Sequence, residues 1–112
     1  MMVSVVMPNY NGGKFIADSI SSVLNQTFSN IELIIVDDNS TDNSLKIIQT
    51  FNEKRIKIIC LSVNKGVSNA RNIGINHSKG KFISFIDSDD YWIESKLETQ
   101  LNFLSQHNLN LT

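Results

Sequence analysis

Three carboxylates stand within four consecutive positions, Asp87-Ser88-Asp89-Asp90, directly after the apolar run 82–86. Like charges this close repel one another, so such a cluster usually persists because a divalent cation or a set of hydrogen-bond donors compensates it. Carboxylate oxygens are ligands that Mg²⁺ and Mn²⁺ prefer. The spacing of Asp87 and Asp89 suits one carboxylate on a ribose and the other on a metal, whereas Asp90 is also explained as a helix cap. The cluster therefore predicts a cation-assisted ligand site.

A second acidic pair, Asp37-Asp38, follows the apolar run 31–36. Helix N-capping explains Ser40 or Asp42 just beyond it, but it explains two successive aspartates at a strand end poorly. A carboxylate here could accept the imide N–H of a uracil or the hydroxyls of a ribose. We favour this ligand-binding interpretation more strongly for Asp38 than for Asp37.

The turn Pro8-Asn9-Tyr10-Asn11 joins the first apolar run to the first helical pattern. It has neither the G-x-G-x-x-G spacing of a dinucleotide site nor the Gly-Lys-Ser/Thr of a P-loop. Pro8 fixes φ and leaves its carbonyl free, and Tyr10 offers a flat face for a nucleotide base. An ordinary turn with a half-buried tyrosine is an equally open interpretation.

The segment 64–72 leads into the third helical pattern and contains two residues of interest. Gly66 permits an unusual backbone angle. Arg71 either reaches toward anionic or carbonyl groups of a ligand at the strand ends, or is the structural partner of one of the aspartates. The sequence leaves both roles of Arg71 open.

These residues need elements that bring them together, and the chain alternates four apolar runs with four helical patterns. The runs are 3–7, 31–36, 56–61 and 82–86, and the helices are predicted at 14–25, 42–53, 67–76 and 94–107. No run alternates strictly with polar residues, as expected for strands covered on both faces by helices. Ala70 and Gly74, one turn apart, should let the third helix approach the sheet closely. The βαβαβαβα order predicts a Rossmann-like α/β fold with a mainly parallel sheet, whose ligands bind at the carboxyl ends of the strands.

Composition narrows the function classes. The 112 residues are enough for one domain, 1–112, and the net charge of −1 provides no basic surface for nucleic acid. The single cysteine, Cys60, excludes an internal disulfide, and we expect it to be buried in a core strand. No apolar run approaches the roughly 20 residues of a spanning helix, and the N-terminus has no signal pattern. We expect a cytoplasmic location, with peripheral membrane association left open for a full-length protein.

Taken together, the chain resembles a family 2 glycosyltransferase with the GT-A fold. The matching segments, in family order, are 3–11, 21–28, 32–42, 64–74 and 85–90, together with Gly80. Each motif is weak alone, but five in the right order and spacing over nearly the whole chain are specific. The resemblance implies that this chain is the N-terminal, nucleotide-sugar-binding half of such an enzyme.

The resemblance also implies the roles of individual residues. Pro8 and Tyr10 would lie at the base, and Asp38 would bind the uracil of a UDP-sugar. The implied nucleotide-binding set is Pro8, Tyr10, Asp37, Asp38, Arg71 and Asp87. Asp87 and Asp89 would form the DxD element, with Asp89 the more direct ligand of Mn²⁺ or Mg²⁺, which neutralises the leaving diphosphate.

Members of this family invert the anomeric centre, and their acceptor site and general base follow the DxD element. We therefore expect the general base beyond Thr112, a glycan or lipid-linked acceptor bound by residues outside this chain, and no transfer by this chain alone. An exposed sheet edge would favour a homodimer.

Three alternatives remain at this stage. A phosphoacceptor receiver domain would carry its acidic pair after the first strand and its phosphorylated aspartate after the third, whereas here the clusters follow the second and fourth. A sugar-phosphate nucleotidyltransferase would need a glycine-rich loop after the first strand. A non-catalytic nucleotide-binding or assembly module is not separated from a glycosyltransferase by sequence.

Overall fold

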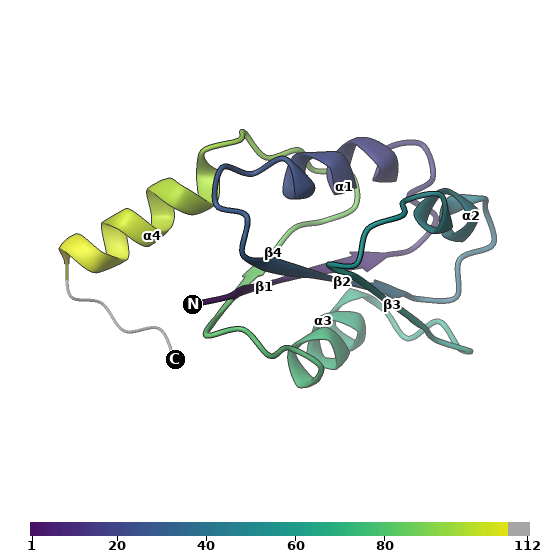
Figure 1. The fold of residues 1–112 in the computed structure, drawn as a ribbon. Coiled ribbons are helices and arrows are strands. Elements are labelled where there is room, and N and C mark those ends of the chain that lie inside the picture. The colour runs from purple at the N-terminus through teal and green to yellow at the C-terminus, as the bar shows by residue number, and fades with distance from the viewer. Residues whose placement is uncertain (108–112) are drawn as a thin grey trace.

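The computed structural model describes residues 1–107, in which a four-stranded parallel sheet carries helices on both faces (Figure 1). The elements are β1 (Val3–Asn9), α1 (Ile16–Leu24), β2 (Ile31–Asp37), α2 (Ser44–Gln49), β3 (Ile56–Cys60), α3 (Val67–Asn76), β4 (Phe82–Phe85) and α4 (Lys96–Gln106). The strand order is β3-β2-β1-β4. The predicted α/β class, element order and parallel sheet are thus confirmed. Helix α2 is shorter than predicted. Its last turn has 3₁₀-type hydrogen bonds, from the Thr50 N–H to the Ile47 carbonyl and from the Phe51 N–H to the Ile48 carbonyl, and these end the helix.

The register of the strands decides which residues meet at the carboxyl edge. Strands β1 and β2 pair from Val3 with Ile31 to Asn9 with Asp37, so their last residues lie side by side. Strand β4 pairs with β1 only as far as Phe85 opposite Val6, and the chain then continues past the end of β1. The turns after β1, β2 and β4 therefore come together at one edge of the sheet.

The core lies on both faces of the two central strands, every residue of which is buried. On the face covered by α1 and α2, the buried cluster includes Val5, Leu33 and Trp92; on the α3 face it consists of Ile34, Val36 and Ala70. The edge strands are only partly covered, so the expectation of strands buried on both faces is right for β1 and β2 and wrong for β3 and β4. Edge position also explains why Cys60, expected in the core, is exposed.

Glycine at position 74 lets α3 lie directly on β1, as the sequence predicted. A Cβ added to Gly74 would stand 2.3 Å from Val6 Cγ1, in a part of the sheet that is fully buried. An alanine would improve helix propensity by about 1 kcal/mol, but overpacking in a rigid core costs about 1–3 kcal/mol.

We therefore expect Gly74→Ala to lower the free energy of unfolding by up to about 2 kcal/mol, measured by urea denaturation. In the double variant with Val6→Ala, the loss should be smaller than the sum of the two single losses, because the second change removes the methyl groups that clash. A Gly74→Ala chain as stable as the starting protein would contradict the close packing.

The outer edge of β4 is open among the described residues. Ile83 and Phe85 are 41% and 43% exposed, and an apolar groove runs between β4 and α4 with Phe82, Leu101 and Phe103 in its walls. The homodimer prediction assumed an exposed sheet edge, and β4 provides one. Dimerisation itself stays a prediction. No helix in the described part of the chain is long and apolar enough to cross a membrane.

Candidate functional site

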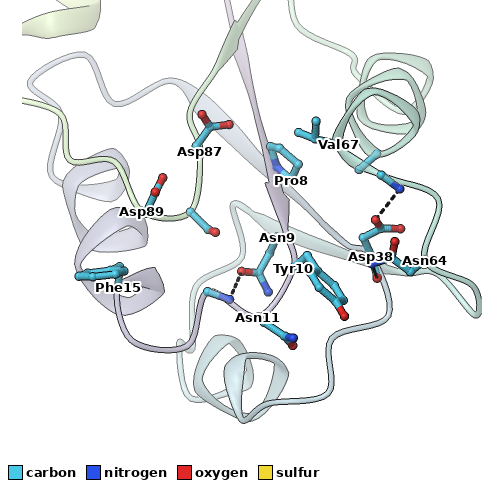
Figure 2. A pocket seen from close by; sticks show the side chains of 14 residues that line it. Pro8, Asn9, Tyr10, Asn11, Phe15, Asp38, Asn64, Val67, Asp87 and Asp89 are labelled. Carbon is cyan, nitrogen blue, oxygen red and sulfur yellow. Dashed lines mark hydrogen bonds between the residues drawn. The ribbon is translucent and has the colours of Figure 1, made fainter.

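A pocket opens at the carboxyl edge of the sheet (Figure 2), where four separate segments meet. Its walls come from the turn after β1, from Asp38 with the start of α3, and from the loop after β4. Of the residues predicted for the site, the structure brings together Pro8, Tyr10, Asp38, Asp87 and Asp89 around this pocket. Asp37 and Arg71 are not among the residues that line the pocket.

Asp38 forms one wall of the pocket and holds the turn before α3. Its side chain is almost fully buried, and its two oxygens accept the backbone N–H groups of Lys65 (3.0 Å) and Gly66 (2.8 Å). Gly66 adopts φ of 96°, the left-handed region that its sequence position suggested. A carboxylate has about four lone-pair sites, so Asp38 keeps acceptor capacity for one further donor from the pocket.

Asp37 is placed differently from its neighbour. Its Oδ1 accepts the side chains of Asn9 (2.8 Å) and Ser40 (2.7 Å), and its Oδ2 accepts the backbone N–H of Ser40 (3.0 Å). Asp37 is the last residue of β2 and does not line the pocket, whereas Asp38, just beyond the strand, does. Asp37 is thus buried and held by structural hydrogen bonds, and its predicted direct contact with the nucleotide stays a prediction.

Arg71 takes the second of the two roles that the sequence left open. Its Nη2 lies 2.9 Å from Asp87 Oδ1, and its guanidinium lies 6.0 Å from the ring centre of Phe85. Within residues 1–107, Arg71 Nε is a buried nitrogen without a hydrogen-bond partner. Arg71 thus holds one oxygen of Asp87 rather than lining the pocket itself.

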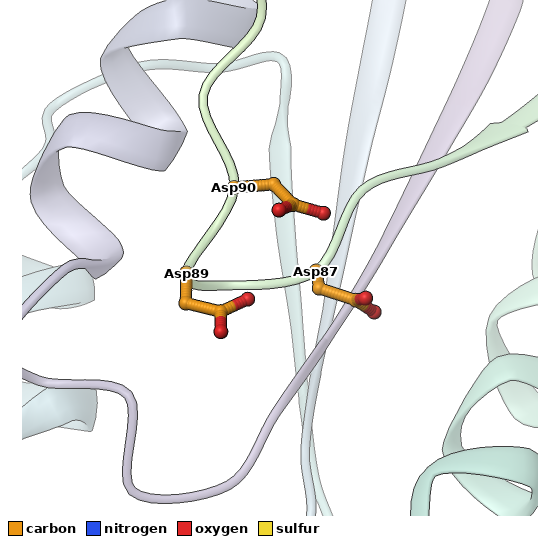
Figure 3. A group of neighbouring side chains, drawn as sticks. All are labelled: Asp87, Asp89 and Asp90. Carbon is orange, nitrogen blue, oxygen red and sulfur yellow. The ribbon is translucent and has the colours of Figure 1, made fainter.

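The acidic loop after β4 carries Asp87, Asp89 and Asp90 (Figure 3), and one oxygen of each lies within 4.8 Å of the others. Helix α1 holds this loop in place, because Ser19 Oγ contacts the carbonyl oxygens of Ser88 (2.8 Å) and Asp90. Arg71 compensates one of the three carboxylates, so two negative charges remain without an ion-pair partner in the described region. The donor set is all oxygen, and it fits a divalent Mg²⁺ or Mn²⁺ ion.

The structure adds residues that sequence reasoning did not assign. Tyr10 is 52% exposed at the pocket rim, and Phe15, also about half exposed, lies on the opposite side of the same rim. In the sequence, Phe15 is an apolar residue outside the buried stripe of the first predicted helix. This exposed aromatic position could have indicated a role in the site. Asn64 also lines the pocket and donates from Nδ2 to the Asp38 carbonyl (3.1 Å), and Val67 adds apolar surface. The pocket therefore has an aromatic residue and carboxylate on each side, with Phe15 near Asp87 and Asp89 and with Tyr10 near Asp38 (Figure 2).

Comparisons with known proteins agree with this geometry. The model of the family described as Glycosyl transferase family 2 matches residues 4–112. An uncharacterized glycosyltransferase of Haemophilus influenzae is 44% identical over 99% of this chain and 45% of its own length. The Escherichia coli protein WfgD, named as a UDP-Glc:alpha-D-GlcNAc-diphosphoundecaprenol beta-1,3-glucosyltransferase, is 43% identical over 97% of this chain and 43% of its own length. The chain thus spans less than half the length of these curated relatives.

Solved structures give the same result. The crystal structure of S. aureus TarS residues 1–349 in complex with UDP-GlcNAc superposes with a TM-score of 0.90 at 34% identity, covering 96% of this chain and 32% of that one. A family model that matches nearly the whole chain, close sequence relatives and a close structural neighbour all point to one assignment. The chain belongs to glycosyl transferase family 2.

Proposed function

We propose that this chain is the donor-binding part of a glycosyltransferase that takes its sugar from a UDP-sugar with the help of Mn²⁺ or Mg²⁺. The observation that carries the proposal is the meeting of Asp38, Tyr10 and the Asp87-Asp89 pair around one pocket. The relatives that match it add support, since TarS is described with UDP-GlcNAc and WfgD by name uses a UDP-glucose donor.

Each side of the pocket has a distinct part in this proposal. The Asp38 carboxylate accepts the imide N–H of uracil, while Pro8 and Tyr10 provide flat surface against the ring. Asp89 and the Asp87 oxygen that Arg71 leaves free hold the divalent cation. When bound, that cation acts as a Lewis acid on the diphosphate and stabilises it as a leaving group. Arg71 keeps the Asp87 carboxylate oriented during this step.

The finer points extend the proposal beyond the described residues. We infer a single inverting displacement in which a carboxylate deprotonates the acceptor hydroxyl. Neither Asp90 nor Glu94 is placed as that base by any contact, so we assign the base, and the acceptor site, to residues of the full-length protein outside this chain. A lipid-linked glycan is the acceptor class we propose, because WfgD is named for an acceptor of this kind.

Calorimetric titration with UDP, with and without Mn²⁺, tests the proposed function. We expect saturable binding that requires or is strongly enhanced by Mn²⁺, and weaker binding of ADP and GDP. A folded sample that binds no nucleotide under any of these conditions would contradict the proposal and favour an assembly module that shares only the family's ancestry.

Asp38→Asn tests the base contact through a change of preference rather than a simple loss. Uracil presents an N–H donor where cytosine presents an acceptor, and an asparagine can donate where an aspartate only accepts. We expect Asp38→Asn to weaken UDP binding by about 10- to 100-fold, the cost of an unmatched buried hydrogen bond, and to shift the preference from UDP toward CDP.

Asp18→Asn serves as the matched control for Asp38→Asn, because Asp18 is exposed on α1 and the change in charge is the same. The control should bind UDP and CDP as the starting protein does. An Asp38→Asn variant with an unchanged ratio of UDP to CDP affinity would show that Asp38 does not contact the base.

A further inference from the structure

Asn9, the last residue of β1, has a buried side chain that joins three segments at the carboxyl edge. Its Nδ2 donates to Asp37 Oδ1 (2.8 Å) and Ser44 Oγ (2.9 Å), with a longer contact to Ser40 Oγ (3.3 Å). Its Oδ1 accepts the backbone N–H of Gly12 (3.2 Å). One amide thus ties the end of β2, the start of α2 and the turn before α1 to the end of β1.

The chemistry of these partners requires an amide at position 9. A carboxylate, Asp37, faces one end of the side chain and needs a donor, while an N–H, that of Gly12, faces the other end and needs an acceptor. Asparagine provides both, and aspartate provides acceptors alone. An aspartate here would place two buried carboxylates at hydrogen-bond distance, which is costly for both.

The residues that follow this pair are those that line the pocket. Tyr10 follows Asn9, and Asp38 follows Asp37, whose register position is opposite Asn9. The backbone N–H of Asp38 also donates to the Asn9 carbonyl (2.8 Å). The Asn9–Asp37 side-chain contact, together with this backbone bond, therefore holds Tyr10 and Asp38 in their relative positions, and Asn9 itself also lines the pocket.

We propose that Asn9 is a positioning residue of the nucleotide site, and that Asp37 acts through Asn9 instead of touching the nucleotide. The proposal rests on the proposed function, since it names what holds Tyr10 and Asp38 in register for the base. A buried support of this kind fixes the geometry of the side chains that contact a ligand. Small displacements of such side chains reduce binding or rate by up to about 100-fold.

An exchange of the two residues tests this proposal. We expect Asn9→Asp to weaken UDP binding by about 10- to 100-fold. The double variant Asn9→Asp with Asp37→Asn restores one amide facing one carboxylate, and we expect it to return UDP affinity to within about threefold of the starting protein. Rescue by exchange is not expected if Asp37 itself contacts the nucleotide, because the carboxylate would then be in the wrong place.

Two controls separate positioning from general loss of structure. Ile48→Val reduces a buried side chain of α2 that does not line the pocket, and it should leave the UDP affinity of the folded protein unchanged. Amide hydrogen exchange at the N–H groups of Asp38 and Gly12 should be faster in Asn9→Asp and slow again in the exchanged variant. This exchange readout needs no ligand, so it tests the Asn9–Asp37 pair even if UDP binding, and with it the proposed function, fails.

The outcomes that overturn the proposal are specific. One is an Asn9→Asp chain that keeps both protected amides and full UDP affinity. The other is an exchanged variant that folds but recovers neither amide protection nor UDP binding. If Asn9→Asp alone does not fold, the exchanged variant tests the proposal by itself. Recovered amide protection and UDP binding support the proposal, and a folded exchanged variant that recovers neither overturns it.

Discussion

Replacing Asp89 with asparagine is expected to remove the Mn²⁺-dependent part of UDP binding, with a loss of affinity of about 100-fold at saturating Mn²⁺. Asp89 has no ion-pair partner among the described residues, and its carboxylate lies with those of Asp87 and Asp90 within 4.8 Å. An amide of the same shape keeps one oxygen but loses the charge that a hard divalent cation requires. Without the cation, the diphosphate would face the remaining carboxylates uncompensated, and this repulsion is why the expected effect is large.

Titration calorimetry with UDP and, separately, Mn²⁺ electron paramagnetic resonance measure the two halves of this prediction. Asp18→Asn carries the same charge change on an exposed part of α1 and should change neither signal. Asp90→Asn decides whether the third carboxylate takes part, because its position permits contact with the cation but its sequence context also fits a cap. Unchanged Mn²⁺ binding in Asp89→Asn would place the cation elsewhere or remove it from the mechanism.

Asp87 should respond differently from Asp89, because Arg71 holds one of its oxygens at 2.9 Å. Both groups of this pair are more than one-third exposed, so its contribution to stability is small. The ion pair instead fixes the orientation of the Asp87 carboxylate, because a carboxylate free to rotate would offer the cation no constant ligand position. We therefore assign Arg71 to the support of the cation site, a role distinct from the direct nucleotide contact that the family resemblance implied.

The fold was predictable because its signals are local and repeat along the chain. Apolar runs separated by helical patterns require crossovers, and crossovers require a parallel sheet, so the common edge that collects Pro8, Asp38 and Asp87 follows from the order of elements alone. The close approach of α3 to the sheet was likewise indicated by Ala70 and Gly74, two small residues one turn apart, whereas the contact with Val6 comes from the structure.

What the sequence did not provide is the direction of individual side chains and the position of strands in the sheet. Asp37 and Asp38 are chemically identical, and the sequence alone does not say which of them faces the pocket. Cys60 and the apolar residues of β4 were expected in the core because apolar runs look alike in central and edge strands. Only the strand order, β3-β2-β1-β4, shows that β3 and β4 are the edges.

A buried carboxylate at the opposite end of the sheet also escaped sequence reasoning. Glu32, in the middle of an apolar run, accepts Ser4 Oγ (2.5 Å), Lys57 Nζ (2.7 Å) and the backbone N–H of Lys79 (2.7 Å). Ser4 Oγ in turn accepts the N–H of Gly80 (2.7 Å). Glu32 therefore joins β1, β3 and the connection into β4 through one side chain that is almost fully buried.

The pKa of Glu32 follows from these contacts. Burial by itself would raise the pKa, but the hydrogen bonds from Lys57, Ser4 and the Lys79 N–H outweigh burial and hold the pKa below its ordinary value of 4.5. A carboxylate whose pKa is lowered in the folded state stabilises the protein above its unfolded pKa. That stabilisation is lost as the pH falls from about 4.5 through the lower folded value.

Glu32→Gln should accordingly lower the free energy of unfolding by about 1–3 kcal/mol at pH 7, because the buried Ser4 hydroxyl and the partly exposed Lys57 ammonium lose their charged acceptor. The same comparison below pH 4 should show a smaller difference, since the glutamate is then losing its own charge. Urea denaturation across this pH range measures both effects, and Glu94→Gln, at an exposed position, provides the control with no expected change. Because Glu32 fixes the connection that leads into β4, its loss should also loosen β4 and the loop after it that carries Asp87 and Asp89, so UDP affinity should fall with stability in this variant. A difference in stability that stays constant from pH 7 to pH 3.5 would mean that the charge of Glu32 is not what holds these segments together.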